Sequence, residues 1–258
     1  MKYLILIFSL VFTTLLVSPE KSLAQVTCEG SPAADNRAGR KKVKKWDNCK
    51  GVQFYHTRKI ELKYDGFFIK GKRTGQGTEE ILAPAEFFGE IYIGEFKRNK
   101  RTGQGSLVYA SGDKYVGEVK NSIRSGQGKY ISVNGDVQEG YWEKDILING
   151  KYILVNGDFQ EGYWEKNFLV NGFVDSEMSD GAHYVGDWKN KLINGQGKYT
   201  WPNGDFQEGY FEKGFLINGF YDGETSEGAH YVGDWKNKGA GGQGKFTWPN
   251  GEFLEGYF

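Results

Sequence analysis

The chain repeats one five-residue pattern at nearly constant spacing from about residue 61 to its last residue. The pattern is an aromatic residue or Gln, any residue, Gly, an acidic residue or Tyr, and a large apolar residue, as in Tyr184-Val185-Gly186-Asp187-Trp188. From Gly94 to Gly256 the central glycines are spaced by 23, 23, 22, 24, 23, 24 and 23 residues. A fixed period of this kind predicts a stacked array of one supersecondary unit.

Each unit has room for two short strands and two turns, but not for a helix as well. A second β-prone run, such as Lys198-Tyr199-Thr200-Trp201, follows the pattern and ends in Asn-Gly. The Asn-Gly pairs lie at 134–135, 156–157, 203–204 and 250–251. Asn-Gly between β-prone runs predicts tight hairpin turns, because both residues tolerate positive φ. The 38 glycines among 258 residues, with 16% aromatic residues, fit many turns between aromatic-rich strands and exclude a disordered chain.

The combination of Tyr-x-Gly-Glu/Asp-Phe/Trp with a following Gly-x-Gly resembles the MORN repeat (membrane occupation and recognition nexus). Tyr184 to Trp188 followed by Gly195-Gln196-Gly197 is one example, and the resemblance extends over most of the chain. It implies an all-β fold, in which consecutive β-hairpins form one elongated, twisted, single antiparallel sheet. We expect this array to occupy residues 61–258, as about eight units and a truncated ninth.

Some copies depart from the family pattern in a correlated way. At Gly140, Gly162 and Gly209 the leading Tyr is replaced by Gln, and a Tyr follows the glycine instead. In the same copies Gly-x-Gly is reduced to Asn-Gly, at 149–150, 171–172 and 218–219. The segment 181–191 recurs at 228–238, which indicates the duplication of a pair of repeats.

Side chains alternate between the faces of a strand, so Tyr184, Gly186 and Trp188 share one face and Asp187 lies on the other. We expect the glycine to leave a slot for a ring from the next hairpin. The residues expected to pack in this way are Tyr92, Gly94, Phe96, Tyr115, Gly117, Gly140, Trp142, Gly162, Trp164, Tyr184, Gly186, Trp188, Gly209, Phe211, Tyr231, Gly233 and Trp235.

Four tyrosines follow the central glycine and therefore point to the opposite face: Tyr141, Tyr163, Tyr210 and Tyr257. Two interpretations remain open for them. They pack in a second buried face, or they form an exposed surface for binding or self-association.

The first residues have the features of a secretory signal peptide. Lys2 precedes an apolar run from Tyr3 to Val17, and Ser22-Leu23-Ala24 offers small residues for cleavage before Gln25. We therefore expect residues 1–24 to be removed and the protein to be exported, to a periplasmic or extracellular location. In such an oxidising compartment Cys28 and Cys49 are expected to form a disulfide in an N-terminal segment, residues 25–60.

Charge is divided along the chain, although 33 basic and 33 acidic residues balance. Residues 25–130 hold 21 Lys or Arg and 12 Asp or Glu, whereas residues 131–258 hold 10 and 20. An elongated array would therefore carry a long electrostatic dipole. The densest basic run, a candidate patch for anionic lipid or a solvated loop, comprises Arg40, Lys41, Lys42, Lys44 and Lys45.

Catalysis has little support in the sequence. His183 and His230 recur at one phase of the repeat, and Gly-Gln-Gly is not followed by the Lys-Ser/Thr of a phosphate-binding loop. We expect solvated or cross-strand polar roles for these histidines, and no catalytic residues, metal site, cofactor, nucleic-acid partner or small-molecule substrate.

The sequence favours a non-catalytic, exported repeat scaffold that mediates protein–protein interaction through self-association. The expected dipole would favour antiparallel or head-to-tail pairing, and an array that stops within a hairpin would offer an open strand edge. An alternative is peripheral binding to anionic membrane lipids through the basic N-terminal part. A more remote alternative is a carbohydrate-binding protein or hydrolase that uses the aromatic face.

Overall fold

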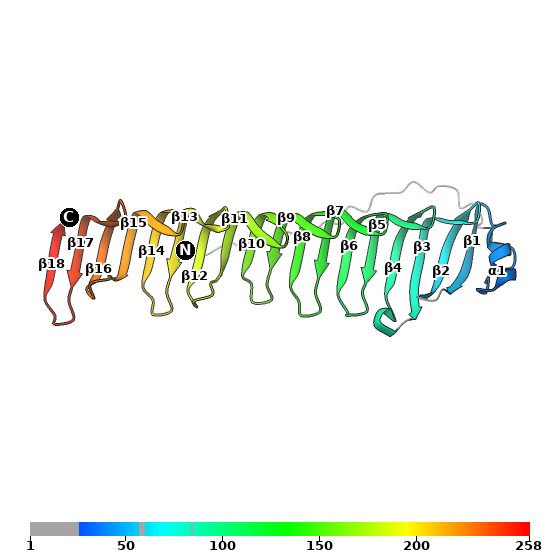
Figure 1. Cartoon of the computed structure of the whole chain (residues 1–258), viewed down its shortest axis with the longest axis horizontal. Helices are drawn as coiled ribbons and strands as arrows, with labels where there is room; N and C mark the ends of the chain where they lie inside the picture. Colours follow the sequence, from blue (N-terminus) through cyan, green and yellow to red (C-terminus); the bar gives the residue numbers. More distant parts are fainter. Residues whose placement is uncertain (1–25, 57–59, 84) are drawn as a thin grey trace, which may run out of the picture.

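A computed structural model describes residues 26–56, 60–83 and 85–258, and the predicted signal peptide lies outside the described residues. The described chain forms one antiparallel sheet of 18 strands, in which each strand pairs with its neighbours in sequence. Figure 1 shows the result, an elongated molecule of consecutive hairpins with α1 at one end and β18 at the other. The all-β, single-sheet prediction is confirmed.

The elements follow one another in a simple order. The first half contains α1 (Arg37–Val43), β1 (Cys49–His56), β2 (Glu61–Ile69), β3 (Lys72–Ala83), η1 (Ala85–Phe87), β4 (Ile91–Lys97), β5 (Lys100–Val108), β6 (Lys114–Lys120), β7 (Ile123–Ile131) and β8 (Val137–Glu143). The second half contains β9 (Ile146–Ile153), β10 (Phe159–Glu165), β11 (Phe168–Glu177), β12 (His183–Lys189), β13 (Leu192–Thr200), β14 (Phe206–Glu212), β15 (Phe215–Glu224), β16 (His230–Lys236), β17 (Gly239–Thr247) and β18 (Phe253–Tyr257).

One face of the sheet is buried and the other is exposed. In β6 the side chains of Tyr115 and Val119 are buried, whereas Val116 and Glu118 between them are exposed. We call the face of Tyr115 the inner face and the face of Val116 the outer face. Neighbouring side chains of the inner face pack against one another along the twisted sheet. A single layer of strands therefore carries one continuous hydrophobic core.

The inner-face tyrosines lie over glycines of their own hairpin. A Cβ added to Gly186 or Gly197 would come within 2.5 Å of the Tyr184 hydroxyl oxygen. The expectation of a ring from the next hairpin is therefore wrong for this slot, because Tyr184 leans along its own strand over the residue two positions ahead. The Tyr184 hydroxyl donates to the carbonyl of Asp187 at 2.8 Å, beside an irregularity in the pairing of β12 with β13.

The glycines form a ladder along the sheet that is interrupted twice. Glycine faces glycine in every strand pair from Gly51 in β1 to Gly172 in β11. Gly172 then faces Trp188, and Val174 faces Gly186. The same two-residue offset recurs between β15 and β16. The interruptions fall at the two spacings of 24 residues, where β11 and β15 extend to 10 residues.

Hairpin turns of two kinds lie at the two edges of the sheet, and the tight ones are not those that contain Asn-Gly. Asn134 does not have positive φ, but Gly135 does, at 100°. Gly135 N–H donates to the Ser132 carbonyl at 3.0 Å, so glycine ends a wider turn. The Asn-Gly pairs lie in hairpin turns, as predicted, but these turns are wider than the tight turns expected, because only the glycine has positive φ. The tight two-residue turns lie at the opposite sheet edge, where Asn121 and Ser122 have φ of 55° and 70°.

The N-terminal segment covers the first edge of the sheet. Cys28 and Cys49 form the predicted disulfide, and β1 pairs with β2, so the segment continues directly into the sheet. Trp46 is buried, packs edge-on against Phe68 at 4.8 Å between ring centroids, and donates from its indole N–H to the Glu29 carbonyl. Helix α1 begins after Asn36, whose side chain accepts from Gly39 N–H.

The inner face changes its chemistry along the array. The last residue of the five-residue pattern pairs with a residue on the next strand. In the first three repeats this partner is an arginine: Arg73, Arg101 and Arg124. In later repeats the same position is Leu147, Leu169, Ile193, Leu216 and Ala240.

The arginines are held over aromatic rings and paired with acids. The Arg101 guanidinium lies 5.0 Å from the Tyr92 ring centroid, and its Nη2 lies 2.7 Å from buried Glu79. Arg73 pairs with the same carboxylate. Part of the basic charge of the N-terminal half is therefore a component of the core.

Candidate interaction surfaces

The tyrosines that follow the central glycines lie exposed on the outer face. Their exposed fractions are 48% for Tyr141, 40% for Tyr163, 44% for Tyr210 and 74% for Tyr257. Within the described residues no second layer covers this face. Of the two interpretations left open by the sequence, the structure agrees with the exposed surface.

Amide side chains flank the outer tyrosines on neighbouring strands. Tyr141 lies between Gln127 and Asn149 in the strand register, and Tyr210 lies between Gln196 and Asn218. Exposed tyrosine with Asn and Gln is a composition suited to recognition, because it combines rigid apolar area with adaptable hydrogen bonding. We call Tyr141, Tyr163, Tyr210 and Tyr257 the outer tyrosine row.

The residue after the central glycine, which points to the outer face, also explains why Gly-x-Gly is lost in the repeats that have Tyr there. In repeats with an acid at this position, its side chain accepts from the backbone of the next strand, as Asp187 Oδ2 does from Gln196 N–H at 2.9 Å. A Cβ at Gly195 would lie 2.5 Å from that carboxylate oxygen, so the first glycine of Gly-x-Gly makes room for the acid. Where Tyr141 replaces the acid, Ile148 replaces this glycine.

Further apolar side chains extend the exposed outer face. They are Ile93, Val116, Val185 and Val232, which precede central glycines, and Phe173 and Phe220 on β11 and β15. Between the latter two, a trough of about 1000 Å³ runs over Gly186, Gly197, Gly209 and Gly219. Polar contacts interrupt the apolar area, because Lys198 Nζ lies 3.5 Å from Glu208 and 4.0 Å from the Phe206 ring centroid.

A second hollow lies on the inner face where two consecutive repeats have Gln in place of the leading Tyr. Its volume is about 560 Å³, and Gln138, Trp142 and Trp164 line it. Arg124 also lines it, with its guanidinium 4.5 Å from the Trp142 ring centroid and Nε 3.1 Å from Asp145. The hollow thus lies where Gln138 and Gln160 replace the inner-face tyrosines that fill the core in other repeats.

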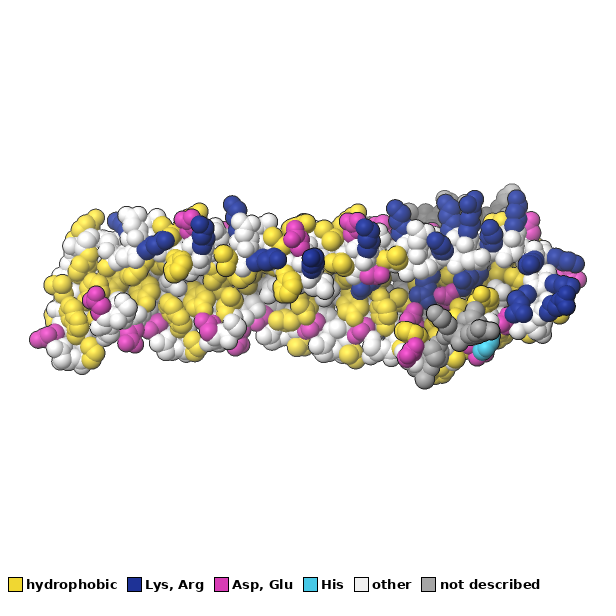
Figure 2. All heavy atoms as spheres, viewed as in Figure 1, with side chains coloured by type: hydrophobic (Ala, Val, Ile, Leu, Met, Phe, Trp, Pro, Cys, Tyr) yellow, Lys and Arg dark blue, Asp and Glu magenta, His cyan; other side chains and the backbone are white. Residues whose placement is uncertain are grey.

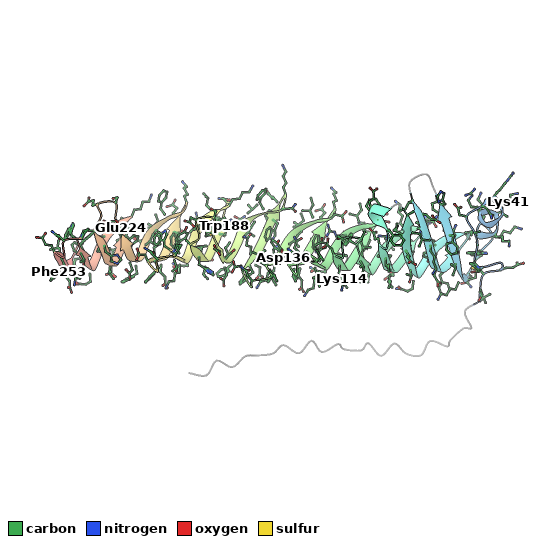
Figure 3. The ribbon with its side chains drawn as sticks, turned by 90° about the horizontal axis from the view of Figure 1, so that it is seen from below. Lys41, Lys114, Asp136, Trp188, Glu224 and Phe253 are labelled. Atoms are coloured by element: carbon green, nitrogen blue, oxygen red, sulfur yellow. A yellow bond between two sulfur atoms is a disulfide. The ribbon has the colours of Figure 1, made fainter. Side chains whose placement is uncertain are left out.

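The basic run lies on a short helix at the end of the molecule. Arg40, Lys41, Lys42, Lys44 and Lys45 are exposed on and just after α1, while Val43 among them is buried. Arg40 pairs with Asp35 at 2.7 Å. Figure 2 shows Lys and Arg side chains gathered over the half of the molecule that begins with α1, and Figure 3 shows Lys41 at its tip.

The two recurrent histidines each pair with an aspartate across β-strands. His183 Nε2 lies 2.7 Å from Asp175 Oδ1, and His230 Nε2 lies 2.8 Å from Asp222 Oδ1. The sequence predicted a polar role for both histidines but did not identify these partners. A signal was present, because in both members of the duplicated pair of repeats the His follows an Asp by eight residues.

The inner-face anchors lie in the core. Tyr92, Phe96, Tyr115, Trp142, Trp164, Tyr184, Phe211 and Tyr231 are buried, and Trp188 and Trp235 are half-buried against them. Burial raises the pKa of Tyr92 and of Tyr115 to about 12. No helix in the described part of the chain is long and apolar enough to cross a membrane.

The fold and its surfaces define a repeat scaffold, a single antiparallel sheet built from stacked hairpins. The family model of the MORN repeat matches five segments, residues 64–80, 92–114, 115–137, 184–206 and 231–253. The chain is therefore a MORN-repeat protein. Each matched segment begins at an inner-face Tyr, whereas the copies with Gln138, Gln160 and Gln207 lie outside the matches. The structure shows that those copies form the same hairpins.

Other comparisons add little. A search of the curated proteins gives no match. Among solved structures, a streptogramin B lyase structure is similar at 13% identity, over 76% of this chain and 65% of that chain. The chain thus spans less than two thirds of that protein's length. The TM-score is 0.16, so this similarity carries no argument about the fold or function.

Proposed function

We propose that this protein is a non-catalytic, exported scaffold that self-associates through its outer face. The observation that carries the proposal is the outer tyrosine row, which lies exposed on an uncovered sheet face beside the apolar residues Val185 and Phe220. Large apolar areas on soluble proteins are typical of interaction surfaces. Packing of two such faces would exclude water from rings that a single layer leaves exposed.

The charge distribution favours an antiparallel arrangement of the two copies. Residues 25–130 carry a net charge of about +9 and residues 131–258 about −10, counted from the same sequence. In an elongated molecule these halves lie at opposite ends, so an antiparallel pair would place opposite charges together. Such pairing should weaken as salt concentration rises.

Sedimentation equilibrium at moderate salt tests the proposal. We expect the chain to form dimers at micromolar concentration, and the combined Tyr141→Ser, Tyr163→Ser and Tyr210→Ser variant to remain monomeric. Tyr55→Ser is the matched control, since Tyr55 is 41% exposed on β1 but lies outside the outer tyrosine row. A monomeric wild-type chain, or a triple variant that still forms dimers, would overturn the proposal.

Export is supported by the disulfide between Cys28 and Cys49, because such bonds persist in oxidising compartments. Together with the predicted signal peptide, the disulfide favours a periplasmic or extracellular location. Fractionation of cells, followed by mass determination of the mature chain, tests this point. Cleavage before Gln25 is the expected result.

Binding to anionic lipid is a second candidate, favoured by the exposed basic residues on and after α1. Only Arg40 among these five has an acidic partner in the described residues. Co-sedimentation with phosphatidylserine vesicles tests it, using Lys41→Gln, Lys42→Gln, Lys44→Gln and Lys45→Gln together. The matched control neutralises four exposed lysines of the acidic half, Lys144, Lys166, Lys189 and Lys213. Equal binding by both variants would exclude the basic helix as the lipid site.

A further inference from the structure

Two clusters of the same residue types lie at the two interruptions of the glycine ladder. One contains Asp158, Asp175 and His183, and the other contains Asp205, Asp222 and His230, 47 residues further along. In each cluster the first Asp precedes a strand, the second lies on the following strand, and the His begins the third. The duplication therefore placed one potential set of metal donors at both interruptions.

The second cluster brings its donors together. One ligand atom from each of Asp205, Asp222 and His230 lies within 4.8 Å of the others, and all three residues are half-buried. Asp222 and His230 are fixed by the pairing of β15 with β16, in which His230 faces Glu224. Glu224 is labelled in Figure 3 and marks this part of the sheet.

The two clusters differ in the freedom of their first aspartate. Asp158 Oδ2 accepts from Glu177 N–H at 3.0 Å and from the Ser176 hydroxyl at 3.4 Å. In the second cluster Gly223 stands at the position of Ser176. Within the described residues, the only hydrogen bond to the Asp205 carboxylate comes from Asn203 Nδ2, at 2.9 Å. The Asp205 carboxylate therefore accepts fewer hydrogen bonds than that of Asp158 and has more lone pairs available for a ligand.

We propose that Asp205, Asp222 and His230 form a binding site for a divalent transition-metal ion such as Zn²⁺. One imidazole nitrogen and two carboxylate oxygens are donors that this class of ion accepts, and three protein ligands leave room for water. Donors around tetrahedral zinc lie about 3.3–3.6 Å apart, given bond lengths of about 2.0–2.2 Å. Modest side-chain rotations from the observed spread would reach that geometry.

Metal binding would replace the hydrogen bond between His230 and Asp222. A neutral imidazole that donates from Nε2 has its lone pair on Nδ1, so binding through Nε2 requires the other tautomer: solvent takes the Nε2 proton and supplies one to Nδ1, and the freed Nε2 lone pair and Asp222 oxygen bind the ion. The ion would then join the loop before β14 to β15 and β16. The ion would cross-link three elements at the place where the glycine ladder shifts register. Because it binds the folded state, it would stabilise this region against unfolding.

Isothermal titration calorimetry of the full chain with ZnCl₂ tests the proposal, without an affinity tag and in a buffer that does not bind metals. We expect saturable binding of one ion per chain. Asp205→Asn and His230→Gln should each weaken binding at least about tenfold, the lower limit typical even for an outer partner of a metal ligand. His183→Gln is the matched control, and it should leave the affinity unchanged.

Thermal unfolding of the same proteins separates metal binding from folding. Zn²⁺ should raise the melting temperature of the wild type and of His183→Gln, but not that of His230→Gln. Absence of saturable binding by the wild type would overturn the site, as would equal loss of affinity in His183→Gln and His230→Gln. Far-UV circular dichroism without metal checks that each variant is folded.

Discussion

The hydroxyl of Tyr184 donates a hydrogen bond to the backbone carbonyl of Asp187 at 2.8 Å, three residues ahead on the same strand. The same relation recurs at Tyr64, Tyr92, Tyr115 and Tyr231. The ring thus covers two glycines, while its hydroxyl satisfies a carbonyl at a strand irregularity. This single contact accounts for the Tyr, the two glycines and their spacing in the repeat.

Removing that hydroxyl should destabilise the array. Tyr184→Phe removes the donor to the part-buried carbonyl of Asp187, and we expect a loss of about 0.5–1.5 kcal/mol in the free energy of unfolding. Urea unfolding followed by circular dichroism measures the change. Tyr210→Phe is the control, because Tyr210 is exposed on the outer face. Equal stability of Tyr184→Phe and the wild type would show that this hydrogen bond is not needed.

A side chain at an inner-face glycine should be costly. A Cβ at Gly197 would lie 2.4 Å from the Tyr184 hydroxyl oxygen, so Gly197→Ala is expected to destabilise by about 1–3 kcal/mol through overpacking. At Gly239 an added Cβ meets nothing within 4 Å, which makes Gly239→Ala the matched control. Thermal unfolding compares the two variants, and similar melting temperatures would contradict the account of the slot.

The sequence predicted much of this fold, because a 23-residue period of glycines and aromatics admits few structures other than stacked hairpins. Face alternation placed Tyr184 and Tyr141 correctly, and compartment chemistry predicted the disulfide between Cys28 and Cys49. The interruption between Gly172 and Trp188 was visible only as a spacing of 24. Whether a spacing of 24 shifts the glycine pairing depends on strand register. Contacts between strands determine the register, and a local sequence pattern does not.

Other features depend on contacts between distant residues. Nothing local in the sequence states that Arg101 lies over Tyr92 and pairs with Glu79, although the absence of Arg after Arg124 marked a change along the array. The turn at Asn134-Gly135 was misjudged, because a longer loop lets glycine alone take the positive φ.

Buried tyrosines should make the protein sensitive to alkali. Burial raises the pKa of Tyr92 and Tyr115 to about 12 in the folded protein, above the ordinary value of 10.0. A raised folded pKa favours the neutral form, so this stabilisation is complete below pH 10 and declines as pH rises toward 12. Denaturant unfolding across this range measures the decline, and tyrosinate absorbance should rise together with unfolding. Constant stability up to pH 12 would contradict the prediction.

Loss of the disulfide should act locally. Replacing Cys28 and Cys49 by Ser opens a loop with a sequence separation of 21, and the chain-entropy estimate for such a loop is about 3 kcal/mol. Because each described strand makes its main contacts with the strands before and after it, hydrogen exchange should accelerate in β1 and β2 and remain unchanged in β16 and β17. Uniform acceleration along the sheet would instead indicate one cooperative unit.

The central claim is that the outer tyrosine row is the surface through which copies associate. Chemical nitration read out by mass spectrometry tests it directly, on dilute and concentrated samples whose assembly is followed by sedimentation. The account predicts that labelling of Tyr141, Tyr163 and Tyr210 falls as the chain assembles, while labelling of Tyr55 stays constant. Equal labelling of the three outer tyrosines in monomeric and assembled samples would contradict it.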